Sequence, residues 1–522
     1  KTSRTFKRFA AITSASLLAA CMVAPMASFA ATPSTVTLTY DNGDSTGHTY
    51  TAYKIFSGTV SNDGKSLEGL AWATDNGADF LTELKKATAD IDGAGTTLGS
   101  LFKDCTTPAS VALVLKDFGN DSTKTKAFAE FAVSQKEYLK AVVGTEDSKI
   151  SVTEDGYYVI AENPLGSGAV NKTMTAYLLG IYDAESGAEI EVKKALPDFT
   201  KQILDVNDTT GSASEAWGTD ADHDIGDEVS FKLIATLPSD YANYKEYKLV
   251  FHDALQDEVF EYVTGSATIA HGSKTATPIT PITTTTCEKT SSVGDDCDLE
   301  FTVEDVKTAY PNAVAGDKIE IIYKAKLTEK AKIGDDGNWN GAYLEYSNNP
   351  YYEGDGDTTS VTPESTVVAF TYQLNVDKID GATKEELAGA GFTLYKKIDN
   401  QYVKIGDEIT GVTTFEWIGL DDGDYKIVES TIPVGYNQAP DLEFTIEAGH
   451  ANKVLSTLSG GDKVTGNVET GILETDIENN SGSSLPSTGG IGTTVFYLGG
   501  GAMVAVAGIY LISKKRMKNT QE

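Results

Sequence analysis

The residue types that most often carry enzyme chemistry are few and scattered in this chain. Its five histidines lie far apart, and the sequence contains no His-Glu-x-x-His or Gly-x-Ser-x-Gly motif. Acidic turns such as residues 353–357 (EGDGD) could hold calcium, but such turns more often simply reverse the chain. The sequence therefore indicates no turnover enzyme, no metal site and no cofactor.

The cysteines offer a different kind of covalent chemistry. Cys287 and Cys297 flank a loop that contains Gly294 and Asp295, which is a spacing that suits a local disulfide in an exported protein. Cys105 is then left over. We expect it to be a buried free thiol, which is more common than a functional one.

The start of the chain indicates export. A basic segment (1–8) is followed by an apolar run (9–26) and by Ser28 and Ala30 at cleavage spacing, which is typical of a signal peptide cut after Ala30. Residues 18–21 (LAAC) resemble the box that directs lipid attachment to a cysteine. The apolar run continues past this box, which favours the ordinary signal peptide.

The far end of the chain has three parts in a fixed order. The pentapeptide Leu485-Pro486-Ser487-Thr488-Gly489 precedes an apolar stretch (491–512) and a basic tail (514–518). The stretch is long enough to span a bilayer, and the basic tail would hold its end in the cytoplasm. This order resembles the cell-wall sorting signal that sortase transpeptidases read in Gram-positive bacteria. The resemblance implies cleavage between Thr488 and Gly489, with the Thr488 carbonyl held as a thioester and passed to an amine.

Charge excludes several classes of partner. The chain has 42 basic and 76 acidic residues, and its formal net charge of -34 is spread along its length. Such a surface repels nucleic acid and anionic membranes and keeps a secreted protein soluble. We therefore expect no nucleic-acid partner, and membrane contact only before sorting.

Between the two targeting segments the pattern is typical of β-strands. Apolar and polar residues alternate over 35–40 and 229–233, and clusters of Gly, Asn and Asp separate such runs at turn positions. Two amphipathic segments, around 80–84 and 127–138, predict helices packed on a sheet in the first unit. This alternation predicts a mainly β fold that is built of β-sandwich domains.

Candidate boundaries divide the 522 residues into five segments. A Pro after a strand-rich segment marks the first junction, and a short polar joint with a Pro marks the second. We expect a signal peptide (1–30), an N-terminal domain (31–194), a middle sandwich (195–363), a C-terminal sandwich (364–482) and a sorting segment (483–522).

The most specific internal motif lies at 425–436 (YKIVESTIPVGY). It resembles the E-box of Gram-positive pilins and of collagen-adhesin B-type domains, although Ser430-Thr431-Ile432 departs from the usual Thr, any residue, Ala. Segments 376–381 and 391–396 resemble the first strands of such a domain, and 476–479 resembles its last. The resemblance implies three tandem immunoglobulin-like sandwiches of the collagen-adhesin A and B types.

In that family a Lys and an Asn join spontaneously in an isopeptide bond. The resemblance assigns Lys378 as the nucleophile, Asn479 as the electrophile, with Asn480 as the fallback, and Glu429 as the catalyst. A buried Lys is more easily neutral and hence nucleophilic, and a protonated Glu429 would activate the Asn479 carbonyl and relay protons as ammonia leaves. Without the resemblance, Lys378 and Glu429 would be interpreted as a surface ion pair.

The middle unit resembles the middle domain of pilus backbone proteins, in which the catalytic acid is an Asp. The matching positions are Lys201, Asp253 and Asn348. Strand alternation places Asn348 on the face shared by Ala342, Leu344 and Tyr346, which favours it over Asn349. In each unit the bond would close a long loop and resist pulling.

The family resemblance as a whole predicts the shaft subunit of a covalent pilus. The usual Tyr-Pro-Lys motif for the joining amine is absent, and by position Lys193, or alternatively Lys194, would accept Thr488 of another subunit. Solvated linker lysines are the competing interpretation. The implied partners are sortase, identical subunits, minor pilins and peptidoglycan, with host matrix or glycan receptors as further candidates. An unpolymerised adhesin is the main alternative. A wall-anchored hydrolase is a third class, for which no catalytic set is recognisable.

Overall fold

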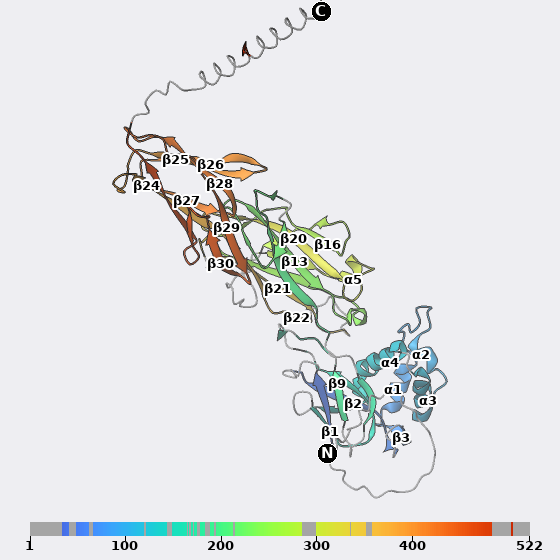
Figure 1. Ribbon diagram of the computed structural model, residues 1–522. Helices are drawn as coiled ribbons and strands as arrows, with labels where there is room; N and C mark the ends of the chain where they lie inside the picture. The colour runs from blue at the N-terminus through green and yellow to red at the C-terminus, as the bar shows by residue number, and fades with distance from the viewer. Residues whose placement is uncertain are drawn as a thin grey trace, which may run out of the picture.

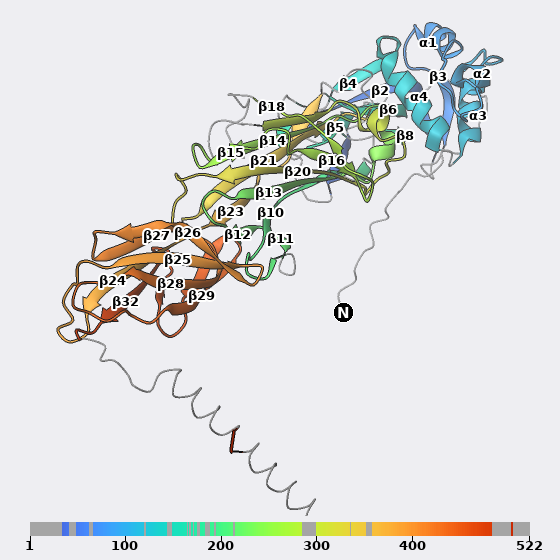
Figure 2. The same cartoon turned by 90° about the horizontal axis from the view of Figure 1, so that it is seen from above.

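The computed structural model describes residues 34–40, 48–61, 66–119, 122–143, 149–163, 165, 169–170, 172–174, 178–182, 188–192, 195–211, 215–283, 299–334, 336–350, 358–482 and 503–504. This part of the chain is mainly β, and its strands form six sheets, which confirms the fold class predicted from alternation. Figures 1 and 2 show three bodies arranged in a row along an elongated molecule. No helix in the described ranges is long and apolar enough to cross a membrane.

The first body combines two small sheets with a layer of helices (Figure 1). One sheet has the order β5 (Lys149–Val152), β1 (Ser34–Tyr40) and β9 (Ala188–Val192). The other has the order β3 (Leu67–Trp72), β2 (Tyr50–Val60), β6 (Gly156–Glu162) and β8 (Leu178–Tyr182), with β4 (Lys140–Val143) paired to β2. The helices are α1 (Gly77–Leu84), α2 (Leu98–Leu101), α3 (Pro108–Phe118), α4 (Ser122–Ser134) and the 3-10 turn η1 (Lys136–Tyr138).

Both predicted helical segments are helical, and two further helices lie between them. Phe80, Leu81 and Leu84 are the buried face of α1. Helix α3 begins at Pro108 after the capping residue Thr107, whose side chain accepts a hydrogen bond from the Ser110 backbone. These helices pack on the sheet through one apolar cluster and so serve as cover for it.

The middle body is a sandwich of two larger sheets. The first has the order β11 (Ala216–Gly218), β10 (Asp198–Asp205), β13 (Glu228–Thr236), β20 (Lys318–Leu327), β16 (Thr268–His271) and β17 (Thr277–Pro278), with β15 (Phe260–Tyr262) paired to β20. The second has the order β12 (Asp220–Asp222), β23 (Ser365–Phe370), β21 (Asn338–Ser347), β14 (Leu249–Leu255), β19 (Leu299–Val303) and β18 (Ile282–Thr283). Two short strands, β22 (Thr359–Val361) and β7 (Ala169–Val170), extend it, and η3 (Tyr241–Asn243) and α5 (Val306–Ala309) lie in its loops.

The C-terminal body is a smaller sandwich (Figure 2). Its four-stranded sheet has the order β27 (Thr414–Leu420), β24 (Tyr372–Asp380), β32 (Ile472–Asn479) and β31 (Thr465–Asn467). Its five-stranded sheet has the order β26 (Gln401–Thr410), β25 (Gly391–Ile398), β28 (Gly423–Thr431), β29 (Leu442–Ala451) and β30 (Val454–Ser459). The first and last strands, β24 and β32, are parallel neighbours.

The second junction lies later in the chain than the sequence indicated. We expected the middle domain to end at residue 363, but β23 pairs with β21 and β12 of the middle sheet. The chain passes to the C-terminal sheet at Thr371, between β23 and β24. The Pro-containing joint that suggested the earlier boundary leads into β23, so a Pro at a strand start was mistaken for a domain linker.

Candidate covalent cross-linking sites

Three side chains predicted to react with one another are buried together in the C-terminal sandwich. Lys378 on β24, Glu429 on β28 and Asn479 on β32 are each at most 2% exposed. The parallel register of β24 and β32 places Lys378 opposite Ile477 and Asp380 opposite Asn479. The two sheets of the sandwich therefore bring the acid from one sheet to the Lys and Asn of the other.

Hydrogen bonds fix these side chains. Asn479 donates from Nδ2 to Glu429 Oε1 at 2.7 Å, and the Ala439 backbone donates to Glu429 Oε2 at 2.7 Å. Lys378 Nζ donates to the carbonyl of Ile477 at 2.9 Å. Within the described residues, Asn479 Oδ1 has no hydrogen-bond partner. The amide group of Asn479 is thus held against the carboxyl group that is expected to act on it.

The electrostatics favour a reactive Lys378. Burial lowers the pKa of Lys378, and the negative charge of Glu429 opposes this effect. A neutral amine can attack the Asn479 carbonyl carbon, forming an amide as the side-chain nitrogen leaves as ammonia. Glu429 lies at hydrogen-bond distance from that leaving nitrogen, which is where a proton donor is needed.

A second buried lysine lies in the middle sandwich. Lys201 on β10 and Asp253 on β14 form an ion pair, and both side chains are fully buried. Tyr323 on β20 donates to Asp253 Oδ1 at 2.8 Å and accepts from Lys201 Nζ at 3.1 Å. Burial lowers the pKa of Lys201 to about 8 and raises the pKa of Asp253, while the charge of each opposes the shift of the other.

The structure does not bring Asn348 to this pair. Its Nδ2 donates to Ser360 Oγ at 2.8 Å, and its main-chain carbonyl accepts from the Met174 backbone N–H at 2.7 Å, at the junction with the first body. The β14–β21 register places Asp253 opposite Ala342, six positions before Asn348. At roughly 3.4 Å per residue, Asn348 is about 20 Å along the strand from Asp253.

Asn340 occupies the position that the prediction gave to Asn348. It is fully buried on β21, its Nδ2 donates to Tyr323 Oη at 2.7 Å, and its Oδ1 has no hydrogen-bond partner within the described chain. Lys201 and Asn340 therefore share the Tyr323 hydroxyl. Alternation had selected the correct face of the strand, but it repeats every second residue and does not fix the position along it.

Several predicted residues lie outside the described ranges. They are Cys287, Cys297, Lys193, Lys194 and the sorting motif with Thr488. Their disulfide, joining and sorting roles stay predictions. Cys105 is described, and it is free and buried as expected.

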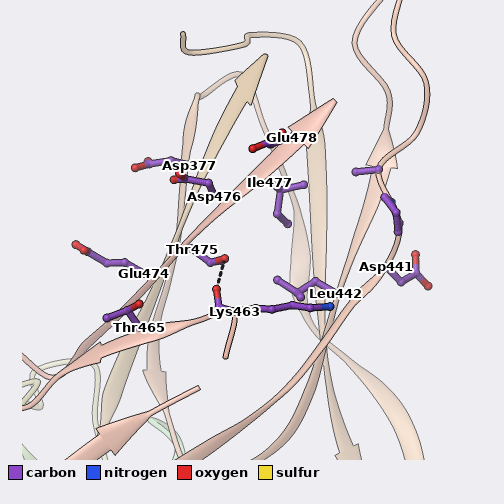
Figure 3. A pocket seen from close by; sticks show the side chains of 12 residues that line it. Asp377, Asp441, Leu442, Lys463, Thr465, Glu474, Thr475, Asp476, Ile477 and Glu478 are labelled. Carbon is purple, nitrogen blue, oxygen red and sulfur yellow. Dashed lines mark hydrogen bonds between the residues drawn. The ribbon is translucent and has the colours of Figure 1, made fainter. Parts of the chain in front are cut away.

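A groove on the C-terminal body (Figure 3) is lined in part by Ile477 and Glu478, which directly precede Asn479 in the chain. Its lining includes a lysine, Lys463, among five acidic side chains: Asp377, Asp441, Glu474, Asp476 and Glu478. The residues that line it include no histidine, serine or cysteine.

Comparisons with known proteins match two segments of this chain to families and most of the chain to one curated relative. The SpaA family of prealbumin-like fold domains matches residues 372–458, and the LPXTG cell wall anchor motif matches residues 477–519. The trypsin-resistant surface T6 protein of Streptococcus pyogenes serotype M6 is 25% identical over 398 residues, which cover 62% of this chain and 70% of that protein.

Solved structures of pilins align with much of this chain at low sequence identity. The T6 backbone pilin of serotype M6 Streptococcus pyogenes is 17% identical with a TM-score of 0.48, over 87% of this chain and 99% of that one. The major pilin SpaA of Corynebacterium diphtheriae is 15% identical with a TM-score of 0.45, over 86% of this chain and 100% of that one.

The anchor motif and the tandem sandwiches define a structural surface protein that is attached to the cell wall. The C-terminal body is accordingly a SpaA-type prealbumin-like domain, and it precedes a cell-wall anchor motif.

Proposed function

We propose that this subunit is polymerised covalently and carries tension through two internal Lys to Asn bonds. The observation that carries the proposal is the burial of two lysines, each beside a carboxyl group and an Asn. Lys201, Asp253 and Asn340 are joined through the Tyr323 hydroxyl. Lys378 donates to the backbone of β32, on which Asn479 is hydrogen-bonded to Glu429. The proposed bonds are Lys378 to Asn479, with Glu429 as the acid, and Lys201 to Asn340, with Asp253 as the acid.

The position of the C-terminal bond suits a load-bearing chain. β24 and β32 run parallel, so a pull on the start of β24 and on the end of β32 acts at opposite ends of the pair. A bond between Lys378 and Asn479 would carry that load directly from the first strand to the last. The roughly 100 residues between them would then be relieved of tension, because the cross-link closes them into a loop.

Polymerisation would use the sorting motif. In the proposed reaction, sortase cleaves the amide between Thr488 and Gly489, holds the Thr488 acyl group as a thioester, and transfers it to the Nζ of Lys193 in another subunit. A new amide forms and the sortase thiol is released. Lys193 directly follows β9, an edge strand among those described in its sheet, and Lys194 is the alternative acceptor.

The direct test is reconstitution with the pilus sortase of the native organism. We expect covalent ladders from the wild-type chain and from either Lys193→Ala or Lys194→Ala, whichever leaves the true acceptor in place, and none from the double variant. Ladders from the double variant would exclude this junction as the acceptor. Adhesion to host or neighbouring cells would follow from display of the polymer and its minor pilins.

The competing proposal is a wall-anchored adhesin that stays monomeric. The groove of Figure 3 is the observation that favours it, because an acidic, lysine-containing hollow could contact a matrix protein or a glycan. Only monomers joined to peptidoglycan would be recovered from the wall in that case.

A further inference from the structure

The junction between the middle and C-terminal bodies contains a dense cluster of carboxylates. Asp222 comes from β12, which lies against the C-terminal body in Figure 2, and Asp421 and Asp422 come from the turn between β27 and β28. One carboxylate oxygen from each of the three lies within 4.8 Å of the other two. The cluster therefore draws ligands from both bodies.

The basic groups nearby are engaged with other carboxylates. Lys396 Nζ donates to Asp224 at 2.6 Å and to Asp208 at 2.8 Å, with Asp421 further away at 3.3 Å. His450 Nδ1 lies 2.8 Å from Asp220 Oδ1, while its Nε2 lies 3.5 Å from Asp222 Oδ1. Two cations, Lys396 and His450, therefore face more carboxylates than they can neutralise. The carboxylates are Asp208, Asp220, Asp222, Asp224, Asp421 and Asp422.

Three oxygen atoms at the centre have no hydrogen-bond partner in the described part of the chain. They are Asp222 Oδ2, Asp422 Oδ1 and the hydroxyl of Tyr372. Asp222 is 2% exposed and Tyr372 is fully buried, so water cannot freely solvate either group. Burial raises the pKa of Tyr372 most, followed by the negative charge of Asp222 and a polar side-chain contact with it, so this hydroxyl lies beside the carboxylates. Buried carboxylate oxygens without a partner are costly, and a bound ion is one of the few ways to satisfy them.

We propose that Asp222, Asp421 and Asp422 bind a calcium ion that ties the middle and C-terminal bodies together. An all-carboxylate set of hard oxygen donors suits Ca²⁺, which accepts irregular geometry, better than Mg²⁺, which requires a near-ideal octahedron. Tyr372 is placed to hydrogen-bond a water molecule on the ion. An exported protein meets calcium outside the cell, where modules with dissociation constants of about 10⁻⁴ to 10⁻³ M are common.

The consequence for the shaft is mechanical. Direct hydrogen bonds already cross the junction, such as Asp421 N to Asp224 Oδ1 at 2.8 Å and Ile225 N to the Gly419 carbonyl at 3.0 Å. An ion held by Asp222 on one side and by Asp421 and Asp422 on the other would resist bending there. Removal of calcium should loosen the junction without unfolding either sandwich.

Calorimetric titration and thermal unfolding of the full chain with CaCl₂ test the proposal, with MgCl₂ at matched ionic strength as the ion control. We expect one calcium site, a melting temperature that rises with Ca²⁺ and not with Mg²⁺, and at least a tenfold loss of affinity in Asp422→Asn. The matched control is Asp407→Asn, a fully exposed carboxylate on β26.

Two outcomes would overturn the calcium site. One is Asp422→Asn binding calcium as the wild type does, and the other is equal stabilisation by Mg²⁺, which would indicate general charge screening. If Asp222→Asn fails to fold, Asp422→Asn still decides the question, because Asp422 is only partly buried and forms no ion pair among the described residues.

Discussion

Lys201 and Asn340 hydrogen-bond the same hydroxyl group, that of Tyr323, at 3.1 and 2.7 Å. This shared contact places the side-chain amide of Asn340 beside the buried pair of Lys201 and Asp253, while Asn348 bonds to Ser360 elsewhere. The relationship changes the expected cross-link of the middle domain from the one that the sequence suggested.

The first prediction separates the two asparagines by mass. After correction for the substitution itself, the Asn340→Ala chain should be heavier by one ammonia than a chain with both bonds, because the Lys201 link cannot form. The chain with Asn348→Ala should keep the link, since that residue does not contact Lys201. Intact-mass measurement and peptide mapping check this. A Lys201 to Asn348 peptide would contradict the assignment.

The second prediction concerns Glu429. Replacement by Gln removes the acid beside Asn479, so we expect Lys378 and Asn479 to stay unlinked and the intact mass to rise by one ammonia beyond the substitution. The loop that the bond closes has about 100 residues, so its loss should lower the free energy of unfolding of the C-terminal domain by about 3 to 5 kcal/mol. Calorimetry measures the second effect. The matched control is Glu447→Gln, an exposed carboxyl group on β29.

Complete linkage of Lys378 to Asn479 in Glu429→Gln would show that this acid is dispensable for bond formation. If the variant forms the bond but is less stable, Glu429 contributes only through its hydrogen bonds to Ala439 and Asn479.

How much of this could be predicted from the sequence differs between the two sites. At the C-terminal site, the E-box resemblance and the strand ends named Lys378, Glu429 and Asn479, and the structure buries all three together. In the middle domain the sequence contains Asn338, Asn340 and Asn348 on one alternating face, and only the register between β14 and β21 distinguishes them. Register depends on pairing partners far apart in sequence, which single-strand patterns do not contain.

The carboxylate cluster at the junction could not be predicted from the sequence either, because its residues are far apart in the chain. Asp222 and Asp422 are 200 positions apart, and each looks like part of an ordinary acidic turn in the sequence. Lys396 likewise follows the pattern of an alternating strand, yet its side chain is fully buried between Asp208 and Asp224 of the middle body and Asp421 of its own body. Only the packing of one body on the other reveals these contacts.

The third prediction tests that packing. Gly419 has φ +83, and a Cβ added there would lie 2.5 Å from the side chain of Ile225 in the middle body. Gly419→Ala should therefore destabilise the junction by about 1 to 3 kcal/mol beyond the backbone effect. Gly411→Ala is the matched control, since its φ is +79 and a Cβ there meets nothing within 4 Å. Equal losses of stability in thermal unfolding would mean that the contact with Ile225 does not matter.

The fourth prediction is a pH dependence in the first body. Hydrogen bonds from Lys140 and then Lys54 lower the pKa of Glu154 to about 2. A carboxyl group with a depressed pKa stabilises the fold above its ordinary value near 4.5, and this contribution is lost as the pH falls toward 2. The wild type should thus exceed Glu154→Gln in stability at pH 6 and approach it at pH 3. Unfolding curves at a series of pH values measure this, with the exposed Glu137→Gln as the control. A gap that does not shrink in acid would exclude the ion pair as its cause.

The central claim is that subunits are joined covalently through the sorting motif. Peptide-mapped mass spectrometry on wall extracts from the native organism tests it most directly. Covalent polymerisation predicts a ladder of multimers whose digests contain Thr488 joined to Lys193 or Lys194, together with the Lys378 to Asn479 and Lys201 to Asn340 links. Recovery of only monomers joined to peptidoglycan through Thr488 would contradict polymerisation and would favour an unpolymerised, wall-anchored adhesin.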